Sequence, residues 1–178
     1  MIHKLADCVL RPVEPKDIPR LYQFKNDPDV AALLGGFRAG LSLADTAEWV
    51  EYHRKRTDEV IWAIADPADD DFLGHVGLYR IDQRVRSAEF AIMIGSKQHW
   101  GRGLGRAVTQ FAVDWGFSEL NLHRIYLSVL ATNERAIHVD KSVGFTEEGR
   151  LRAAQFKGGR FVDLVLMSIL EDEARHET

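Results

Sequence analysis

A glycine-rich segment, QHWGRGLGR at residues 98–106, carries the clearest potential for chemistry. Its alternating glycines let the backbone approach a ligand closely. An amphipathic helical pattern follows at once, and the first amide groups of a helix have no partner within that helix. Together with the helix dipole, these donors favour an anion, typically a phosphate. Arg102 and Arg106 add positive charge beside that position, so the segment predicts a phosphate site.

The glycine spacing excludes two common phosphate-binding motifs. A dinucleotide-binding fold requires Gly-x-Gly-x-x-Gly, with an acidic residue about 20 positions later. This chain has Gly101, Gly103 and Gly105 instead, and its next strand pattern ends in LATN at residues 130–133 without an acid. The sequence contains no Gly-x-x-x-x-Gly-Lys-Ser/Thr loop either. The glycines alone leave a simpler alternative open, a turn that merely begins a helix.

Hydrophobic periodicity predicts the elements that position this segment. Apolar runs favour seven strands, and apolar residues recurring every three to four positions favour four helices. The expected strands are residues 8–13, 60–65, 72–81, 88–94 and 124–130 and two around a Gly-Gly turn at 157–160; the expected helices begin near 16, 43, 104 and 134. This order predicts one α/β domain over residues 1–178, with helices packed on a mixed sheet. Residues 67–71 (PADDD) are expected to form a solvated connection between two strands.

Composition and charge exclude several classes of protein. The chain has 178 residues, of which 46% are hydrophobic and 28% charged, as in ordinary globular proteins. Its net charge of −4 makes a nucleic-acid partner unexpected. A single cysteine, Cys8, excludes an internal disulfide and a Cys-rich zinc site, and no histidine pair has metal-ligand spacing, so no metal is predicted. The sequence has no signal-peptide pattern and no apolar run of about 18–20 residues, so we expect a cytoplasmic protein without a membrane partner.

Several short motifs follow one another from about Gly74 to Leu170. They are GL at 77–78, AEF at 88–90, QxxGxG at 98–103, LNLHR at 120–124, NERAI at 133–137, GF at 144–145, EGRL at 148–151 and Asp163. In this order and spacing the chain resembles the GNAT acyltransferase superfamily, and within it the branch of ribosomal-protein alanine and spermidine N-acetyltransferases. The resemblance implies a GNAT-like fold, a mixed and mostly antiparallel central sheet of about seven strands flanked by about four helices.

The resemblance also implies acetyl-CoA as co-substrate and a primary amine as acceptor, either a small molecule or a protein or peptide N-terminus. The pantetheine arm would pair with the strand that ends in Ile92, Met93 and Ile94, where the sheet of this fold opens. Asn133 would contact that arm, although a plain helix cap explains it as well. The pyrophosphate would bind the amides of Gly101, Arg102, Gly103, Leu104, Gly105 and Arg106. Relatives also suggest a homodimer through the C-terminal strands.

Acetylation of an amine at neutral pH needs a general base. An amine with a pKa near 10.4 is mostly protonated at pH 7, and deprotonating it costs roughly 4–5 kcal/mol. Glu89 is the expected base, because strand alternation places it on one face with Ala91 and Met93. A structural ion pair is the competing interpretation of this glutamate. A backbone amide near Met93 or Ile94 is expected to stabilise the oxyanion while the amine attacks the thioester directly.

The position seven residues after Asn133 departs from the family pattern. Much of the family has a tyrosine there that protonates the leaving thiolate, whereas this chain has Asp140, on one helix face with Ala136 and Val143. Asp140 is either held neutral and donates its proton, which requires a raised pKa, or is bypassed, so that the thiolate leaves to water. The second interpretation is the one we favour. In a third, catalysis is lost and the chain is a non-catalytic acyl-CoA-binding module.

The resemblance implies that the two N-terminal helices and their connection, here residues 31–40 (AALLGGFRAG), wall the acceptor site. The sequence has no acid between Asp29 and Asp45, which disfavours a polyamine because a multiple cation should meet carboxylates. Arg38 is the only charge of the segment and would suit an acceptor that bears a carboxylate or phosphate, such as an amino acid, a peptide or a nucleotide-linked amino sugar. An ordinary surface arginine is the alternative.

Overall fold

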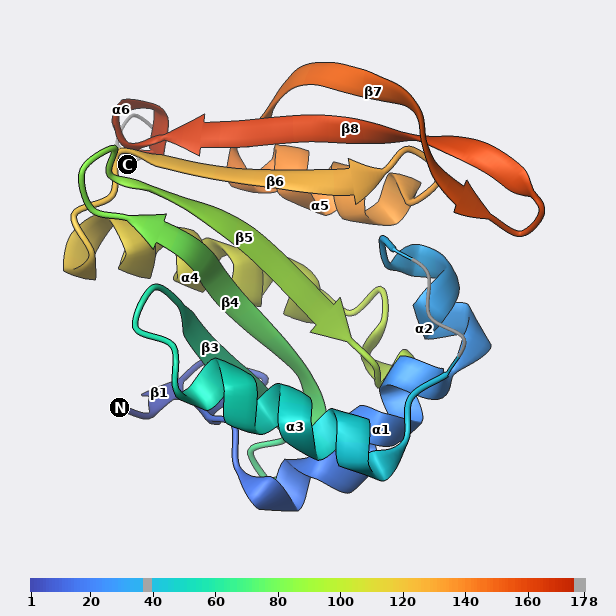
Figure 1. Ribbon diagram of the computed structural model, residues 1–178. Coiled ribbons are helices and arrows are strands. Elements are labelled where there is room, and N and C mark those ends of the chain that lie inside the picture. Colours follow the sequence, from blue (N-terminus) through green and yellow to red (C-terminus); the bar gives the residue numbers. More distant parts are fainter. Residues whose placement is uncertain (37–39, 175–178) are drawn as a thin grey trace.

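The computed structural model describes residues 1–36 and 40–174, and Arg38 lies outside this part of the chain. Within it, eight strands form one sheet in the order β1-β2-β3-β4-β5-β6-β8-β7 (Figure 1). The strands are β1 His3–Lys4, β2 Val9–Pro12, β3 Val60–Ala65, β4 Phe72–Asp82, β5 Ser87–Ile94, β6 Arg124–Leu130, β7 Thr146–Lys157 and β8 Arg160–Leu170. Neighbouring strands are antiparallel except β5 and β6, which are parallel and joined through a helix. This is the mixed, mostly antiparallel sheet that the sequence predicts.

Helices cover both faces of the sheet (Figure 1). The described residues form six α-helices, α1 Ile18–Asn26, α2 Pro28–Leu33, α3 Leu43–Arg54, α4 Leu104–Glu119, α5 Glu134–Val143 and α6 Glu171–Ala174, and two 3-10 helices, η1 Pro15–Asp17 and η2 Lys97–His99. Strand alternation divides the core between two clusters. Trp62 packs in the cluster that contains α4 and α5, and its neighbour Ala63 packs in the cluster that contains α1, α2 and α3. None of the helices in the described ranges has the length and apolar character that crossing a membrane requires.

Two of the α-helices and one of the strands were not predicted by periodicity. β1 has only two residues, too few for any pattern, and α6 has only four. α2 begins at Pro28, only two residues after the last residue of α1, although a proline commonly marks the end of a helix. Pro28 instead occupies the first turn of a new helix, where its missing N–H costs nothing. Asp27 caps that helix by accepting from the amides of Asp29 (2.9 Å) and Val30 (3.3 Å).

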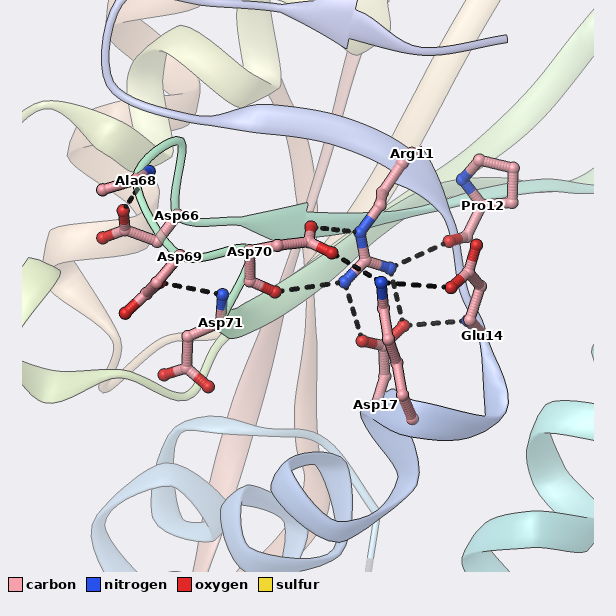
Figure 2. A network of polar contacts seen from close by, with 10 residues as sticks. Arg11, Pro12, Glu14, Asp17, Asp66, Ala68, Asp69, Asp70 and Asp71 are labelled. Atoms are coloured by element: carbon pink, nitrogen blue, oxygen red, sulfur yellow. Dashed lines mark hydrogen bonds and ion pairs between the residues drawn. The ribbon is translucent and has the colours of Figure 1, made fainter.

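A network of ion pairs joins the N-terminal part of the chain to the β3–β4 connection (Figure 2). Arg11 on β2 is 5% exposed. Its two terminal nitrogens each lie 2.8 Å from a carboxylate oxygen of Asp17, and its Nε donates to Asp70 at 2.6 Å. Asp70 also accepts from Lys16, and Arg20 pairs with Asp71. Residues 67–71 do connect two strands, but Asp70 and Asp71 are partners of cations on β2, η1 and α1.

Candidate active site

The glycine-rich segment begins α4 as expected. Gly101 and Gly103 have φ angles of 72° and 88°, in the left-handed region that favours glycine. Gly103 is the N-cap residue of α4 and offers no side-chain cap, so the first amides of this 16-residue helix are open to a ligand. Leu104 buries its side chain in the core and leaves only its backbone in the segment. The arrangement is a helix N-terminus built to receive an anion.

The two arginines of the segment are exposed beside this helix start. Neither Arg102 nor Arg106 is buried, and Arg106 lies 3.4 Å from the carbonyl of Ser142 on α5. Gly105 adjoins the end of β5, because a Cβ atom at this position would lie 3.6 Å from the Ile94 side chain. The start of α4 therefore faces the C-terminal end of β5.

The sheet opens along β5. β5 and β6 pair only at its first residues, from Ser87 opposite Arg124 to Glu89 opposite Tyr126. Beyond that point the two strands diverge, and α4 and α5 lie behind the gap (Figure 1). The edge of β5 from Phe90 onward is thus not paired by β6, which confirms the expected opening of the sheet.

The register shows which backbone groups of β5 face this opening. The amide of Gly95 donates to the carbonyl of Leu73 at 2.9 Å, and the β4–β5 register has no shift along this stretch. In an antiparallel pair only alternate residues bond to the partner strand. Met93 therefore bonds to β4, while Ile92 and Ile94 direct their N–H and C=O groups into the opening.

This alternation corrects one expected role. Met93 was an expected source of the oxyanion-stabilising amide, but its backbone faces β4 and its side chain is 4% exposed, in the core beneath α1 and α3. The structure thus places Ile92 and Ile94 in the opening and keeps Met93 out of it.

Glu89 lies at the point where the two strands separate. Its side chain is 26% exposed and borders an open hollow of about 420 Å³ between α3 and the β4–β5 pair. The guanidinium of Arg80 lies 3.0 Å from Glu89 Oε2, and the Arg80 side chain is 74% exposed. Glu89 therefore has the ion pair that one interpretation expected and also the access to a cavity that the other requires. An ion pair this exposed to solvent is weak.

Aromatic side chains of α3 wall this hollow, a feature that the sequence analysis did not identify, and one of them, Trp49, also packs against the core. Trp49, Tyr52 and His53 stand at helical spacing i, i+3 and i+4, so they share one face. Tyr79 of β4 completes the wall, and burial together with the nearby charges of Glu59 and Glu89 raises its pKa. The spacing of these three α3 residues was the sequence signal that could have indicated the aromatic wall.

Asn133 and Asp140 both lie on α5. Asn133 is confirmed as the N-cap, since its Oδ1 accepts from the amide of Ala136 at 3.2 Å, and its Nδ2 donates to the carbonyl of Leu33 at 3.3 Å. Asp140 is 5% exposed, and burial raises its pKa to about 7. Among the residues that the structure describes, no hydrogen bond to its carboxyl group occurs. The role of either residue toward a ligand stays a prediction.

Comparison with known proteins agrees with this geometry. The sequence model of the "Acetyltransferase (GNAT) domain" matches residues 7–146. The chain is 32% identical to spermidine N(1)-acetyltransferase of Escherichia coli K12 over 173 residues, covering 95% of this chain and 90% of the relative. It is 39% identical to the Vibrio cholerae enzyme of the same name over 110 residues, covering 62% of this chain and 63% of the relative.

A solved structure supports the same assignment. The spermidine N-acetyltransferase of Vibrio cholerae in complex with CoA and spermine superposes with a TM-score of 0.87 at 31% identity, covering 96% of this chain and 99% of that one. The sequence match and the fold agree over nearly the whole length. The chain belongs to the GNAT acetyltransferase family.

Proposed function

We propose that this acetyltransferase moves the acetyl group of acetyl-CoA to a primary amine by direct attack, at the point where β5 and β6 separate. The observation that carries the proposal is the unpaired edge of β5 beside the glycine-rich start of α4. The donor would bind its pyrophosphate at the amides of residues 101–106 and lay its pantetheine arm along Ile94 and Ile92. Acetyl-CoA as donor is also the reason to expect the protein in the cytoplasm.

The open backbone groups of β5 suit the thioester as well as the arm. As the amine attacks, negative charge develops on the carbonyl oxygen, and a fixed N–H group stabilises it. The amide of Ile92 faces the opening and lies three residues from Glu89, so it is the proposed oxyanion donor. Asn133, already the cap of α5, would use its remaining hydrogen-bonding capacity toward the arm.

Glu89 would act as the general base, directly or through water. It borders the hollow through which an amine would reach the opening. Its ion pair with Arg80 is exposed to solvent, so the pair can open and the carboxylate can accept a proton. We expect Glu89→Gln to lower kcat about 10²-fold to 10⁴-fold, measured by release of the CoA thiol. Acetyl-CoA binding should stay within about twofold. Glu48→Gln, on an exposed part of α3, is the control, and equal rates for both variants would refute the role of Glu89.

Asp140 would protonate the leaving thiolate in place of the usual tyrosine. Its burial on α5, which lies behind the opening, and its pKa of about 7 leave a large neutral fraction at neutral pH. A neutral carboxyl group donates a proton, whereas an ionised one would repel the thiolate. This favours the proton-donor interpretation over unaided departure and over a non-catalytic acyl-CoA-binding module. Release of CoA with any amine would exclude that last alternative.

The charges around the hollow favour an acceptor with a single cationic amine. Glu59 bonds to His53 at 2.5 Å, and Glu89 pairs with Arg80, so both carboxylates of the hollow already have partners. The Arg56 side chain also lines the hollow and adds a second cation beside Arg80. A polyamine would bring several more cations into the same hollow, and the like charges would repel one another.

An amine panel tests this choice. It would contain spermidine, free amino acids, dipeptides and aminoalkyl phosphates, each assayed for CoA release. We expect an acceptor with a carboxylate or phosphate to give the highest kcat/KM. If spermidine is the best acceptor, the proposed acceptor class is wrong, but the proposed acetyl transfer to an amine is still supported.

We also propose a homodimer through the β7–β8 hairpin. β7 is an edge strand of the sheet, and the hairpin exposes apolar side chains, Leu151 (47%), Phe156 (56%) and Phe161 (71%). An exposed edge with apolar residues is a template for pairing with another chain. Sedimentation of the wild type and of Phe161→Ser would test it, with a lower mass expected for the variant.

A further inference from the structure

We propose that Trp100 is a positioning residue that sets how far the pantetheine arm of acetyl-CoA reaches along β5. The inference rests on the proposed function, which lays this arm on the open edge of the strand. The indole N–H of Trp100 donates to the carbonyl of Ile94 at 2.8 Å. That carbonyl is the last one that β5 directs into the opening, so a side chain of the protein bonds where a ligand amide would otherwise bond.

Two elements hold the Trp100 ring in place. The ring packs against the core cluster beneath α1 and α3, and the guanidinium carbon of Arg135 lies 4.4 Å from its centre. Arg135 belongs to the first turn of α5, whereas Trp100 directly follows η2 and precedes α4. The contact thus joins the two sides of the opening, and a cation stacked on an indole face stabilises that position.

The consequence concerns the register of the bound arm. A chain with amide groups pairs with a strand edge as an added strand does, through main-chain hydrogen bonds. Equivalent groups on one edge of a strand repeat every two residues, which is about 7 Å. An arm therefore has two registers along this edge, one whose amide bonds to the Ile92 carbonyl and one whose amide bonds to that of Ile94.

Trp100 disfavours the outer of these two registers, because a carbonyl group that already accepts one hydrogen bond is a weaker acceptor for a second. With the Ile94 carbonyl occupied, the arm bonds to Ile92, and its thioester end extends toward Glu89 at the point where the strands separate. In the outer register the thioester would stop about 7 Å short of the base. The inner register is the one that places the acetyl group within reach of attack.

Trp100→Phe tests this role, because it deletes the N–H group and keeps an aromatic ring for Arg135. Trp115→Phe is the matched control, a half-buried tryptophan of α4 that packs on Trp62. For Trp100→Phe we expect kcat with acetyl-CoA to fall about tenfold, since small misplacements of a reacting group are costly. The KM for acetyl-CoA should change less than about threefold, because the arm still binds.

Acyl-chain preference gives a readout that mere loss of packing would not move. An arm that rests in the outer register withdraws the thioester by about 7 Å and so leaves space for a longer acyl tail beyond it. The ratio of kcat/KM for hexanoyl-CoA over acetyl-CoA should therefore rise at least about fivefold in Trp100→Phe. Crystal structures of the wild type and of Trp100→Phe with bound CoA would show the register of the pantetheine arm on β5 directly. We expect a pantetheine amide on the Ile92 carbonyl in the wild type and on the Ile94 carbonyl in the variant.

The outcomes separate this inference from the proposed function. Rates and acyl preference of Trp100→Phe that match those of Trp115→Phe would overturn the role of Trp100 in an active enzyme, as would CoA bonded to the Ile94 carbonyl of the wild type. A wild type that turns over no amine but binds CoA at Ile92, with the shift in the variant, would support the role of Trp100 and refute the proposed activity.

Discussion

Two regions of this protein bury an ionisable side chain, one with hydrogen-bond partners and one without any among the described residues. Beside β2, the Arg11 guanidinium is almost fully buried, and Asp17, Asp70 and a backbone carbonyl accept its hydrogen bonds (Figure 2). On α5, Asp140 is likewise 5% exposed as a residue, and within the described ranges no side-chain or backbone donor bonds to its carboxyl group.

Both environments raise a pKa, but one stabilises the charged form of its group and the other the neutral form. Hydrogen bonds from Arg11 to Asp17 raise the pKa of the guanidinium and stabilise its charge. Burial without a partner raises the pKa of Asp140 to about 7 and stabilises the neutral form. Partnered charges hold this fold together, whereas an unpartnered carboxyl group weakens it and keeps a proton available near neutral pH.

Loss of Arg11 should have the largest effect on stability. Arg11→Met leaves the carboxylate of Asp17, 2% exposed, without its main partner, and breaking a buried pair in this way costs about 3–5 kcal/mol. Urea denaturation at pH 7 would measure the loss. Arg11→Met combined with Asp17→Asn should recover part of it, because the buried charge is then gone. A single-variant loss below about 1 kcal/mol would contradict the account.

Asp140→Asn should have an effect of opposite sign that depends on pH. The pKa in the folded protein is raised from 3.8 to about 7, so the folded state retains a proton that the unfolded chain releases. The free energy of unfolding of the wild type therefore falls as pH rises from about 4 to about 7. Asn does not titrate, so the stability of the variant relative to the wild type should increase by about 2–3 kcal/mol between pH 5 and pH 8. A constant difference across that range would show that Asp140 is not buried as described.

The pH dependence of the rate tests the use of that proton. If Asp140 must be protonated, the wild-type kcat falls above pH 7, the pKa of this group. Asp140→Asn should lack this decline and be slower by about 10²-fold at pH 6.5. Asp140→Tyr should move the decline to higher pH, because the ordinary pKa of tyrosine is about 10. Thiol release between pH 5.5 and 9.5 measures all three proteins, and an identical profile for the wild type and the Asn variant would exclude the role.

The smallest effect is expected for Arg20→Gln. Arg20 pairs with Asp71 in the same network as Arg11, but the two side chains are 40% and 39% exposed. Exposed pairs contribute only about 0–1 kcal/mol, so the midpoint in urea should hardly move. A loss comparable to that of Arg11→Met would show that the network acts as one unit and that burial is not what separates the two pairs.

Much of the fold was predictable because its signals are local. The apolar runs at 60–65 and 124–130 coincide with β3 and β6, and the spacing of apolar residues predicted α4. Ser42 and Asp45, a serine followed three residues later by an acid, form a capping box at the start of α3. α2 was not predicted because a proline commonly marks the end of a helix, although it also suits the first turn of one.

The ion pairs of the β3–β4 connection were not predictable in this way. Asp70 bonds to Arg11 across 59 residues, and Asp71 bonds to Arg20 across 51. A run of aspartates shows no periodicity that identifies such partners, so a solvated connection was the natural expectation. The aromatic wall on α3 was not predicted for a related reason, since the sequence pattern of a helix face is the same whether that face packs on a sheet or borders a hollow.

The sequence by itself determined the family, the order of the seven expected strands and four expected helices, and the glycine-rich helix start, since each depends on residues close together in the chain. Only the tertiary structure decided that Ile92 and Ile94 face the opening and Met93 does not, that Asp140 is buried without a partner, and that Trp100 bonds to the end of β5. Those features depend on strand register and on contacts between distant segments, which no local pattern specifies.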